Sequence, residues 1–449
     1  MTVRTIFDHT AFKWLYPGMH IKRWLVLLLL GIVFMGLGVA YLLKEVYLTW
    51  PAPEWVQHAT LQFMPRWSRG ALFIAVSLGT VGLATWKLNA SLLFAFVRPD
   101  TEQSMAQTIY DRRMRNRGPR VVAIGGGTGL SNLLRGLRAY TSNLTAIVTV
   151  ADDGGSSGRL RKEFGVVAPG DIRQCIAALA ESETLMSRLF QYRFTEGTGL
   201  EGHSFGNLFI VAMSEVTGNF EMAVHETSRV LNVTGSILPS TLEDVTLSAR
   251  TREDELVHGE HNITERGTAI RELYLNPAWA DAHPDAIKAI LAADLIIIGP
   301  GSLYTSVLPN LLVEGVRKAL HAARAPKIFV ANVATQHGET DGFNVTDHLE
   351  VLERHAGGNV VDAVIANSNI VTSLPDAWKS APVTLNGERE GWLGNVRLVA
   401  ADVVAEENRY RHDPAKLAAT LMQVYASRAA IASHRAVGQV ESAAAAAAR

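Results

Sequence analysis

The hydrophobic and polar residues of this chain follow three different patterns. The first hundred residues hold two long apolar runs, at residues 24–43 and 70–97, and only the second contains a charge, at Lys87. The first run is long enough for an α-helix to cross the hydrocarbon of a bilayer, and the second is long enough if Lys87 extends to the interface. We therefore expect a membrane anchor over residues 1–100 with two transmembrane helices.

Charged and aromatic residues around the two runs predict their orientation. Basic residues precede the first run and follow the second, where the basic linker at residues 101–118 includes Arg112 and Arg113. The positive-inside bias therefore places both ends in the cytoplasm and the protein in the inner membrane. A cleaved signal peptide fits poorly, because the long first run passes into Lys44 and Glu45. The alternative that the two runs form a pair of buried helices in a soluble protein also remains, although tryptophans lie at the ends of the runs, as they do at membrane interfaces.

After Gly118 short apolar runs alternate with amphipathic stretches, which is typical of β-α-β units. The apolar runs predict strands at residues 120–124, 145–151, 294–298, 327–331, 360–365 and 396–400. Because they are nearly continuous, we expect a parallel sheet covered on both faces, in one α/β domain over residues 119–410. Residues 245–264 alternate instead and predict an antiparallel hairpin. The Ala-rich tail at 411–449 predicts a surface helix.

Composition removes several classes of function. The chain has 42 basic and 43 acidic residues, so it lacks the basic surface that nucleic-acid binding needs, and we expect no such partner. Its only cysteine, Cys175, excludes a disulfide within the chain and fits a cytosolic domain. The apolar spacing around Cys175 predicts a buried helix face rather than a reactive thiol.

The strongest local motif is VVAIGGGTGL at residues 121–130, in which a strand leads through glycines into a helix. Glycines let the backbone approach a phosphate, which the N–H groups and dipole of the following helix attract. The predicted phosphate contacts are Gly125, Gly126, Gly127, Thr128 and Gly129. Leu130 replaces the third glycine of the dinucleotide fingerprint, which disfavours a nicotinamide oxidoreductase. A tight turn without a ligand remains an alternative.

A second polar segment, ADDGGSSGRLRKEFG, follows the second strand. Ligands of open parallel sheets bind at the carboxyl ends of the strands, so this segment should face the same cleft. Asp152 and Asp153 could accept ribose hydroxyls or hold Mg²⁺ against a phosphate. The G-x-S-x-G match does not indicate a serine hydrolase, because its serine does not directly follow the strand. The predicted contacts here are Asp152, Asp153, Gly155, Ser156 and Ser157, and Asp171 is either a further contact or a helix cap.

Three later segments repeat this pattern of polar residues after apolar runs. GPGSLYTS follows the most apolar strand, HSFGN precedes an apolar helix, and ANVATQHGETDG ends another strand. Neither H-E-x-x-H nor C-x-x-C occurs, so a zinc site is unsupported. For His203 a structural role in the core stays an equal alternative. The predicted ligand contacts in these segments are Gly299, Gly301, Ser302, Tyr304, Thr305, His203, Asn207, Asn332 and Gln336.

Together these motifs resemble the YvcK/CofD-like family, whose members include the bacterial gluconeogenesis factor and the 2-phospho-L-lactate transferase. The resemblance spans about residues 119–402 and is carried by GGGTGL, DDGGSSGRLR, APGDIRQ, HSFGN, GPGSLYTSVLPNLL and NVATQHGET. It favours the gluconeogenesis-factor branch. The resemblance implies a Rossmann-like fold whose cleft binds a nucleotide sugar such as UDP-N-acetylglucosamine, and a role in cell shape and wall-precursor metabolism.

The resemblance also assigns residues and partners. Tyr304 is the implied ligand contact of the gluconeogenesis-factor branch, and Asp171 is the counterpart of a substrate contact in the transferase branch. Two hypotheses stay open: a ligand-binding regulator, and a transferase that resembles the 2-phospho-L-lactate transferase and uses Mg²⁺ with a bound nucleotide. The expected partners are a nucleotide sugar, the lipid bilayer, a regulated protein and further copies of this chain.

Overall fold

The computed structural model describes residues 22–49, 66–96, 105–180, 185–370, 379–385 and 390–427, together with positions 53, 55, 58, 61 and 63–65. The contacts divide the chain into two units, Met1–Met114 and Arg115–Arg449. Residues 428–449, which hold most of the predicted C-terminal tail, lie outside the described part, as does the basic segment before residue 22.

The N-terminal unit contains two long helices, α1 (Lys22–Thr49) and α3 (Arg66–Phe96), which include the two apolar runs. Among the described residues one segment, Arg66–Ala84 with a mean hydropathy of 1.3, is long and apolar enough to cross a membrane. The large apolar side chains described on both helices are exposed, Phe34 and Leu78 among them. Two helices are therefore present, and their crossing of a membrane remains a prediction. The basic linker contains helix α4 (Met105–Asn116).

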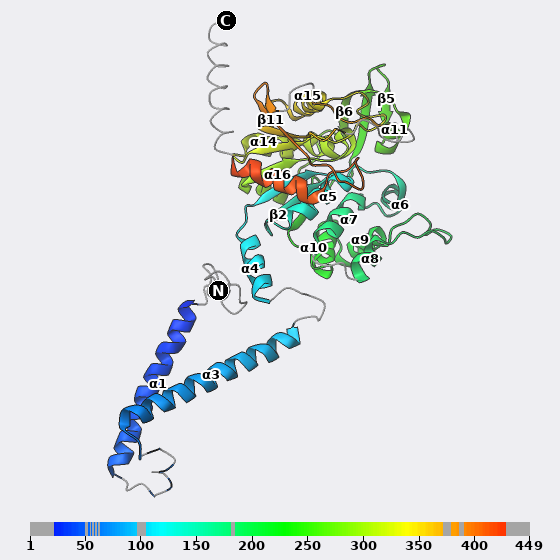
Figure 1. The fold of residues 1–449 in the computed structure, drawn as a ribbon. Helices are drawn as coiled ribbons and strands as arrows, with labels where there is room; N and C mark the ends of the chain where they lie inside the picture. Colours follow the sequence, from blue (N-terminus) through cyan, green and yellow to red (C-terminus); the bar gives the residue numbers. More distant parts are fainter. Residues whose placement is uncertain are drawn as a thin grey trace. The chain divides into compact units, whose positions relative to one another are not determined.

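The second unit is built on one large sheet, which has eight strands in the described part of the chain (Figure 1). Their order is β10-β11-β9-β8-β7-β1-β2-β3, and all pairs are parallel except β10 with β11. The strands are β1 (Val121–Gly125), β2 (Leu144–Val148), β3 (Ser236–Pro239), β7 (Leu295–Ile298), β8 (Lys327–Val330), β9 (Ala363–Asn367), β10 (Glu390–Leu393) and β11 (Val396–Ala401). The predicted mostly parallel α/β sheet is therefore confirmed.

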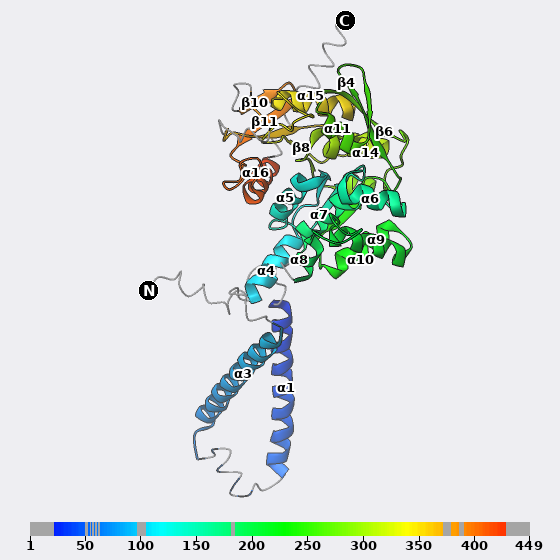
Figure 2. The same ribbon diagram turned by 90° about the vertical axis from the view of Figure 1, so that its right-hand side faces the viewer.

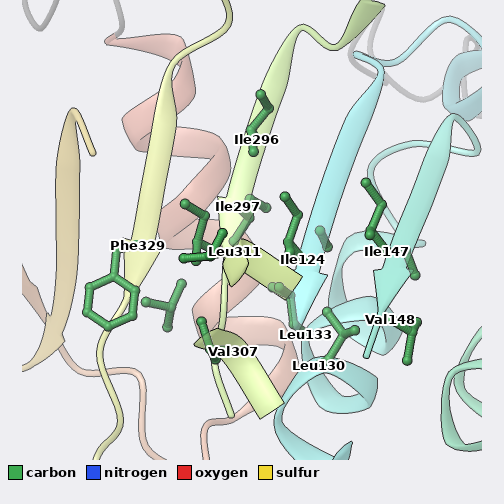
Figure 3. Close-up of a cluster of buried hydrophobic side chains, with 14 of the residues drawn as sticks. Ile124, Leu130, Leu133, Ile147, Val148, Ile296, Ile297, Val307, Leu311 and Phe329 are labelled. Atoms are coloured by element: carbon green, nitrogen blue, oxygen red, sulfur yellow. The ribbon is translucent and has the colours of Figure 1, made fainter. Parts of the chain in front are cut away.

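Helices cover both faces of this sheet, as right-handed crossovers require. Helices α5 (Gly127–Leu137) and α7 (Gly170–Leu179) pack together against β2, while α12 (Pro284–Ala292), α13 (Leu308–Leu312), α14 (Glu314–Ala322) and α15 (Val345–Ala356) form the other group. Every residue of β1, β7 and β8 is buried, because side chains from both layers pack on them. Figure 3 shows this core, with Ile124 of β1 between Ile147 of β2 and Ile297 of β7.

A smaller antiparallel sheet accounts for the alternating segment at residues 245–264. It consists of β4 (Thr246–Thr251), β5 (Leu256–His258) and β6 (Ile270–Asn276), with α11 (Glu260–Arg266) after β5 (Figure 2). The predicted hairpin exists as β4 and β5. The prediction was wrong at residues 260–264, which form a helix, and β6 was missed.

The remaining helices lie around the α5 side of the sheet. They are α6 (Gly155–Phe164), α8 (Leu185–Gln191), α9 (Phe205–Thr217), α10 (Phe220–Val230) and α16 (Pro414–Ala426). Helix α16 packs against α5 and buries Leu417 and Leu421 completely (Figure 1). The prediction of a tail helix on the surface was therefore wrong for α16, because its apolar face is part of the domain core.

Candidate functional site

The order of the strands reverses at β1. The chain runs outward from β1 through β2 to β3, then returns so that β7 pairs with the other side of β1. In open parallel sheets the carboxyl ends of the strands beside such a switch point form the ligand-binding crevice. The first glycine loop follows β1 and the GPGSLYTS loop follows β7, so both lie at this point.

These two glycine loops are in direct contact. A methyl group on Gly129 would lie 2.5 Å from the carbonyl oxygen of Pro300, and one on Gly301 would lie 3.2 Å from the Gly126 oxygen. The backbone of Gly127 has a φ of +61° and that of Gly301 a φ of +158°, conformations that side chains with a Cβ rarely adopt. The glycines therefore allow both the turns and their close approach.

The DDGGSSG segment joins the same edge through the start of α7. A methyl group on Gly126 would overlap the carboxylate of Asp171, and one on Gly170 would overlap Ser157 and come within 2.9 Å of Asp152 Oδ2. Three segments that are distant in the sequence, around residues 126, 157 and 301, therefore converge at one edge of the sheet.

A cavity of about 270 Å³ opens on the β7 and β8 side of this edge. Its walls come from the start of α5, the loops after β7 and β8, and two segments near the C-terminus. The lining residues are Thr128, Gly129, Asn132, Pro300, Gly301, Ser302, Asn332, Val333, Ala334, Thr335, Gln336, Ser380, Tyr410, Arg411 and His412. Among the predicted contacts, Thr128, Gly129, Gly301, Ser302, Asn332 and Gln336 are thus brought together.

Amide side chains hold the loops after β7 and β8 together in the cavity wall. Asn332 accepts a hydrogen bond from the Gly301 N–H at 3.3 Å and donates one to the Gly301 oxygen at 2.8 Å. Ser302 donates to Gln336 Oε1, and Gln336 Nε2 donates to Glu339 Oε1 at 2.7 Å. These residues therefore shape the cavity, and the Ser302 hydroxyl is already engaged within the protein.

Glu339 is a buried carboxyl group behind this wall. Its Oε1 accepts from the Thr305 hydroxyl at 3.0 Å, and its Oε2 has no hydrogen-bond partner among the described residues. Burial raises the pKa of Glu339 to about 7, against the hydrogen bonds from Thr305 and the Tyr304 backbone, which lower it. Thr305, a predicted ligand contact, is thus placed against Glu339.

Carboxyl groups also gather on the β2 side of the edge. Burial and the nearby Asp152 raise the pKa of Asp171 to about 7, although it accepts a hydrogen bond from the Gly127 N–H. Burial raises the pKa of Glu260 to about 8, and Asp152, Glu339, Asp153 and Asp171 all add to this shift. Crowded carboxyl groups favour neighbours that donate hydrogen bonds, such as sugar hydroxyls.

Asp152 and Asp153 have different partners. Asp152 accepts from the Gly154 N–H at 2.9 Å, which forms a local turn, whereas Asp153 accepts from the Glu260 and His261 N–H groups at 3.1 and 2.9 Å. Asp153 therefore caps α11. The described residues contain no group of three or more His, Cys, Asp or Glu side chains arranged to hold a metal ion.

Ser156, His203 and Asn207 form a hydrogen-bonded group on the α6 and α9 side. Asn207 Nδ2 donates to Ser156 Oγ at 3.1 Å, and Ser156 Oγ lies 3.0 Å from His203 Nδ1. All three side chains are buried, and none of them lines the cavity. Gly155 begins α6 with a φ of +47° and open space beside it.

Tyr304 lies in the core. Its side chain is 1% exposed, its ring packs edge-on against Phe343 and His355, and its hydroxyl donates to the Ile270 oxygen at 3.4 Å. Burial raises its pKa to about 12. The ring implied as a ligand contact is therefore separated from the cavity, because Leu303–Val307 forms a π-helical turn that directs it inward.

Sequence reasoning missed Glu260, Glu339 and the C-terminal wall of the cavity. Glu339 lies in the quoted NVATQHGET string, so its position after a strand was an available signal. Arg411 supplies a charged side chain to the cavity wall, next to His412, whose pKa burial lowers to about 4. No local pattern around residues 410–412 indicated that this segment returns to the strand ends.

Comparisons with known proteins match this geometry. The family model described as "2-phospho-L-lactate transferase CofD" matches residues 121–403. The chain is 44% identical over 314 residues to the gluconeogenesis factor of Bacillus subtilis, covering 68% of this chain and 98% of that protein. It is 46% identical over 429 residues to a protein of Nostoc sp., covering 92% of each.

A solved structure supports the same assignment. The crystal structure of a UPF0052-family protein from Bacillus halodurans matches with a TM-score of 0.64 and 41% identity, covering 68% of this chain and 99% of the other. The Halalkalibacterium halodurans protein at 42% identity over 307 residues is also named gluconeogenesis factor. The chain therefore belongs to the CofD family, in the branch of the gluconeogenesis factors.

Proposed function

We propose that this chain is a membrane-tethered regulator whose cleft binds a nucleotide sugar of the UDP-N-acetylglucosamine type. In this proposal, ligand occupancy changes a surface that a partner protein recognises, and so links sugar metabolism to cell shape and wall-precursor supply. The family assignment supports the general role. The cleft at the switch point of the sheet supports the ligand.

One observation carries the proposal. Helices α5, α6 and α7 all begin at this edge, and the N-cap residue of each, a glycine or a proline, provides no side-chain cap. Apart from the Gly127 N–H, which donates to Asp171, these first turns leave N–H groups and the positive end of the helix dipole available to an anion. Three such helix starts suit the phosphates of a nucleotide.

The carboxyl groups complement these donors. The phosphates would bind at the glycine loops, while Asp152, Asp171 and Glu260 lie where hydroxyl groups of a ribose or hexose could donate hydrogen bonds. A diphosphate linked to two sugars carries both kinds of group. Arg411 in the cavity wall adds a positive charge near the glycine loops.

Calorimetry tests the proposal directly. The detergent-solubilised full chain is titrated with UDP-N-acetylglucosamine, with and without Mg²⁺, and the mixture is then examined by mass spectrometry. We expect saturable one-site binding and recovery of the intact ligand. Absence of binding heat would refute the nucleotide-sugar proposal.

The second candidate is a transferase of a phosphorylated group that resembles the 2-phospho-L-lactate transferase. It is favoured by the carboxyl groups of Asp171 and Glu260, whose pKa values of about 7 and 8 would let them exchange protons near neutral pH. Conversion of a nucleotide-bound substrate in the same mass-spectrometric experiment, dependent on Mg²⁺, would replace the regulator by this enzyme.

The inner-membrane location is part of the proposal. The Nostoc alignment spans 92% of this chain and so includes most of the first 114 residues, which supports a shared anchor. The test uses a Cys175→Ala background carrying either His58→Cys, between the helices, or Arg112→Cys after them. A membrane-impermeant maleimide should label intact cells only at position 58. Equal labelling at both positions would exclude the hairpin.

A further inference from the structure

A group of three arginines surrounds His203, apart from the cavity. Arg159 of α6 donates to the Glu201 oxygen at 2.8 Å, and Arg193, after α8, donates to the Gly202 oxygen at 2.6 Å. Arg173 of α7 donates through Nε to Asn207 Oδ1 at 2.9 Å. These three residues, which we call the arginine cluster, come from three separate segments of the chain.

The arginine cluster has no bound counter-ion within the described protein. Neutral carbonyl oxygens are the hydrogen-bond acceptors, and none of the ion pairs among the described residues includes Arg159, Arg173 or Arg193. By contrast, Arg161 on the same helix as Arg159 is paired with Asp244. Each guanidinium has five N–H groups, so each retains donors after these contacts.

The charges of the arginine cluster act on one another. Arg193 lowers the pKa of Arg173, and both Arg159 and Arg193 lower the pKa of His203, after burial as the main cause. Asp171 raises the pKa of Arg173 and Glu163 raises the pKa of His203, and neither carboxylate forms an ion pair with these residues. The positive charges of the three guanidinium groups repel one another, so binding of an anion from solution would lower their electrostatic energy.

Buried side chains support one member of the arginine cluster, Arg173. Asn207 Nδ2 donates to Ser156 Oγ, which lies 3.0 Å from His203 Nδ1, so the three buried side chains form one hydrogen-bonded group. Asn207 Oδ1 in turn holds Arg173 Nε. Ser156, His203 and Asn207 are 5%, 4% and 2% exposed, which makes this support rigid.

We propose that Arg159, Arg173 and Arg193, supported by the Ser156–His203–Asn207 group, form a second anion site that binds a phosphate group. Guanidinium groups bind phosphate oxygens in bidentate pairs, and no carboxylate of the described residues forms an ion pair with these three arginines. None of the three arginines lines the cavity. Arg173 lies two residues after Asp171, so this second site adjoins the carboxyl groups assigned to the nucleotide sugar. Inorganic phosphate or the phosphate of a phosphorylated sugar would supply the same chemistry.

The test titrates the full chain with inorganic pyrophosphate while a saturating nucleotide sugar occupies the cleft. Arg173→Met and Arg193→Met should each weaken pyrophosphate binding by at least tenfold and leave nucleotide-sugar affinity within twofold. Arg271→Met is the matched control, because Arg271 is 57% exposed and lies 3.4 Å from Asp254 on the antiparallel sheet. Equal pyrophosphate affinity in all variants would overturn the proposal, as would absence of pyrophosphate binding by the unmodified chain. Glucose 6-phosphate and inorganic phosphate, each used in place of pyrophosphate, distinguish a sugar phosphate from a free phosphate.

A second measurement needs no substitution. Phenylglyoxal modifies accessible arginines, and mass spectrometry identifies the modified peptides. Pyrophosphate should protect Arg159 and Arg193, the exposed members of the arginine cluster, and leave Arg271 equally reactive. If Arg159 and Arg193 react at the same rate with and without pyrophosphate, the anion site is refuted, and the arginines only hold the backbone at residues 201–202 in place. This labelling experiment uses no nucleotide sugar, so its outcome does not depend on the proposed nucleotide-sugar site.

Discussion

Replacement of Gly129 by alanine probes the contact between the first and third glycine loops. The added methyl carbon would lie 2.5 Å from the Pro300 oxygen, 2.7 Å from its carbonyl carbon and 2.9 Å from Gly301 Cα. All three are backbone atoms, so no side-chain rotation can relieve the overlap. Ordinary contact begins near 3.4 Å, so the Pro300 carbonyl would have to move by about 0.9 Å.

The expected energies follow from this displacement. Overpacking of this kind costs about 1–3 kcal/mol. Alanine in a helix regains about 1 kcal/mol relative to glycine, and Gly129 lies in the first turn of α5. The net loss of stability should therefore be about 0–2 kcal/mol, while the shifted cavity wall should weaken nucleotide-sugar binding by at least tenfold, or about 1.4 kcal/mol.

Gly125→Ala is the matched control. Its added methyl group would come no closer than 3.7 Å to the same Pro300 oxygen, which is ordinary contact. The assay compares both variants with the unmodified chain by thermal unfolding and by calorimetry with UDP-N-acetylglucosamine. If Gly129→Ala and Gly125→Ala bind the ligand equally well, the contact of the two loops does not form the binding site.

The remaining predictions concern Tyr304 and Glu339. Tyr304→Ala should destabilise the domain by about 3–5 kcal/mol because it leaves a cavity in the core. Tyr304→Phe loses only the long hydrogen bond to the Ile270 oxygen and should keep nucleotide-sugar affinity within twofold. A larger loss of affinity in calorimetry would show that the tyrosine contacts the ligand. The pKa of Glu339 is raised by folding to about 7, so its contribution to stability is full below the unfolded pKa and is lost as pH rises through about 7. Glu339→Gln should therefore reduce the change in the free energy of urea unfolding between pH 5 and pH 8 by at most about 3 kcal/mol. An unchanged pH dependence of that free energy would contradict the burial of Glu339.

The parts of the fold that were predictable are those with a continuous local signal. Buried parallel strands are mostly apolar, so β1, β7 and β8 were visible as runs, although β8 begins with the buried Lys327. Glycine loops between a strand and a helix likewise marked the switch point. By contrast, β3 is a short strand ending in Pro239, and α11 interrupts an alternating segment that favoured strands throughout.

The site was predictable only where residues follow strands directly. The convergence of the loops follows from parallel strands having their carboxyl ends on one edge, and the structure has this arrangement. Side-chain direction does not follow from the sequence. The π-helical turn directs Tyr304 into the core, and the Glu260 N–H at the start of α11 donates a hydrogen bond to Asp153. The return of Arg411 to the cavity depends on how α16 packs, which is a tertiary effect.

Photochemical labelling tests the central claim most directly. The full chain is irradiated with a photoreactive UDP-N-acetylglucosamine analogue, and the labelled peptides are identified by mass spectrometry. The account predicts label in peptides that contain residues 126–132, 299–302, 332–336 or 410–412, with competition by the unmodified nucleotide sugar. Competable label found only in other peptides, such as those of α10 and β3, would contradict a binding site at the switch point of the sheet.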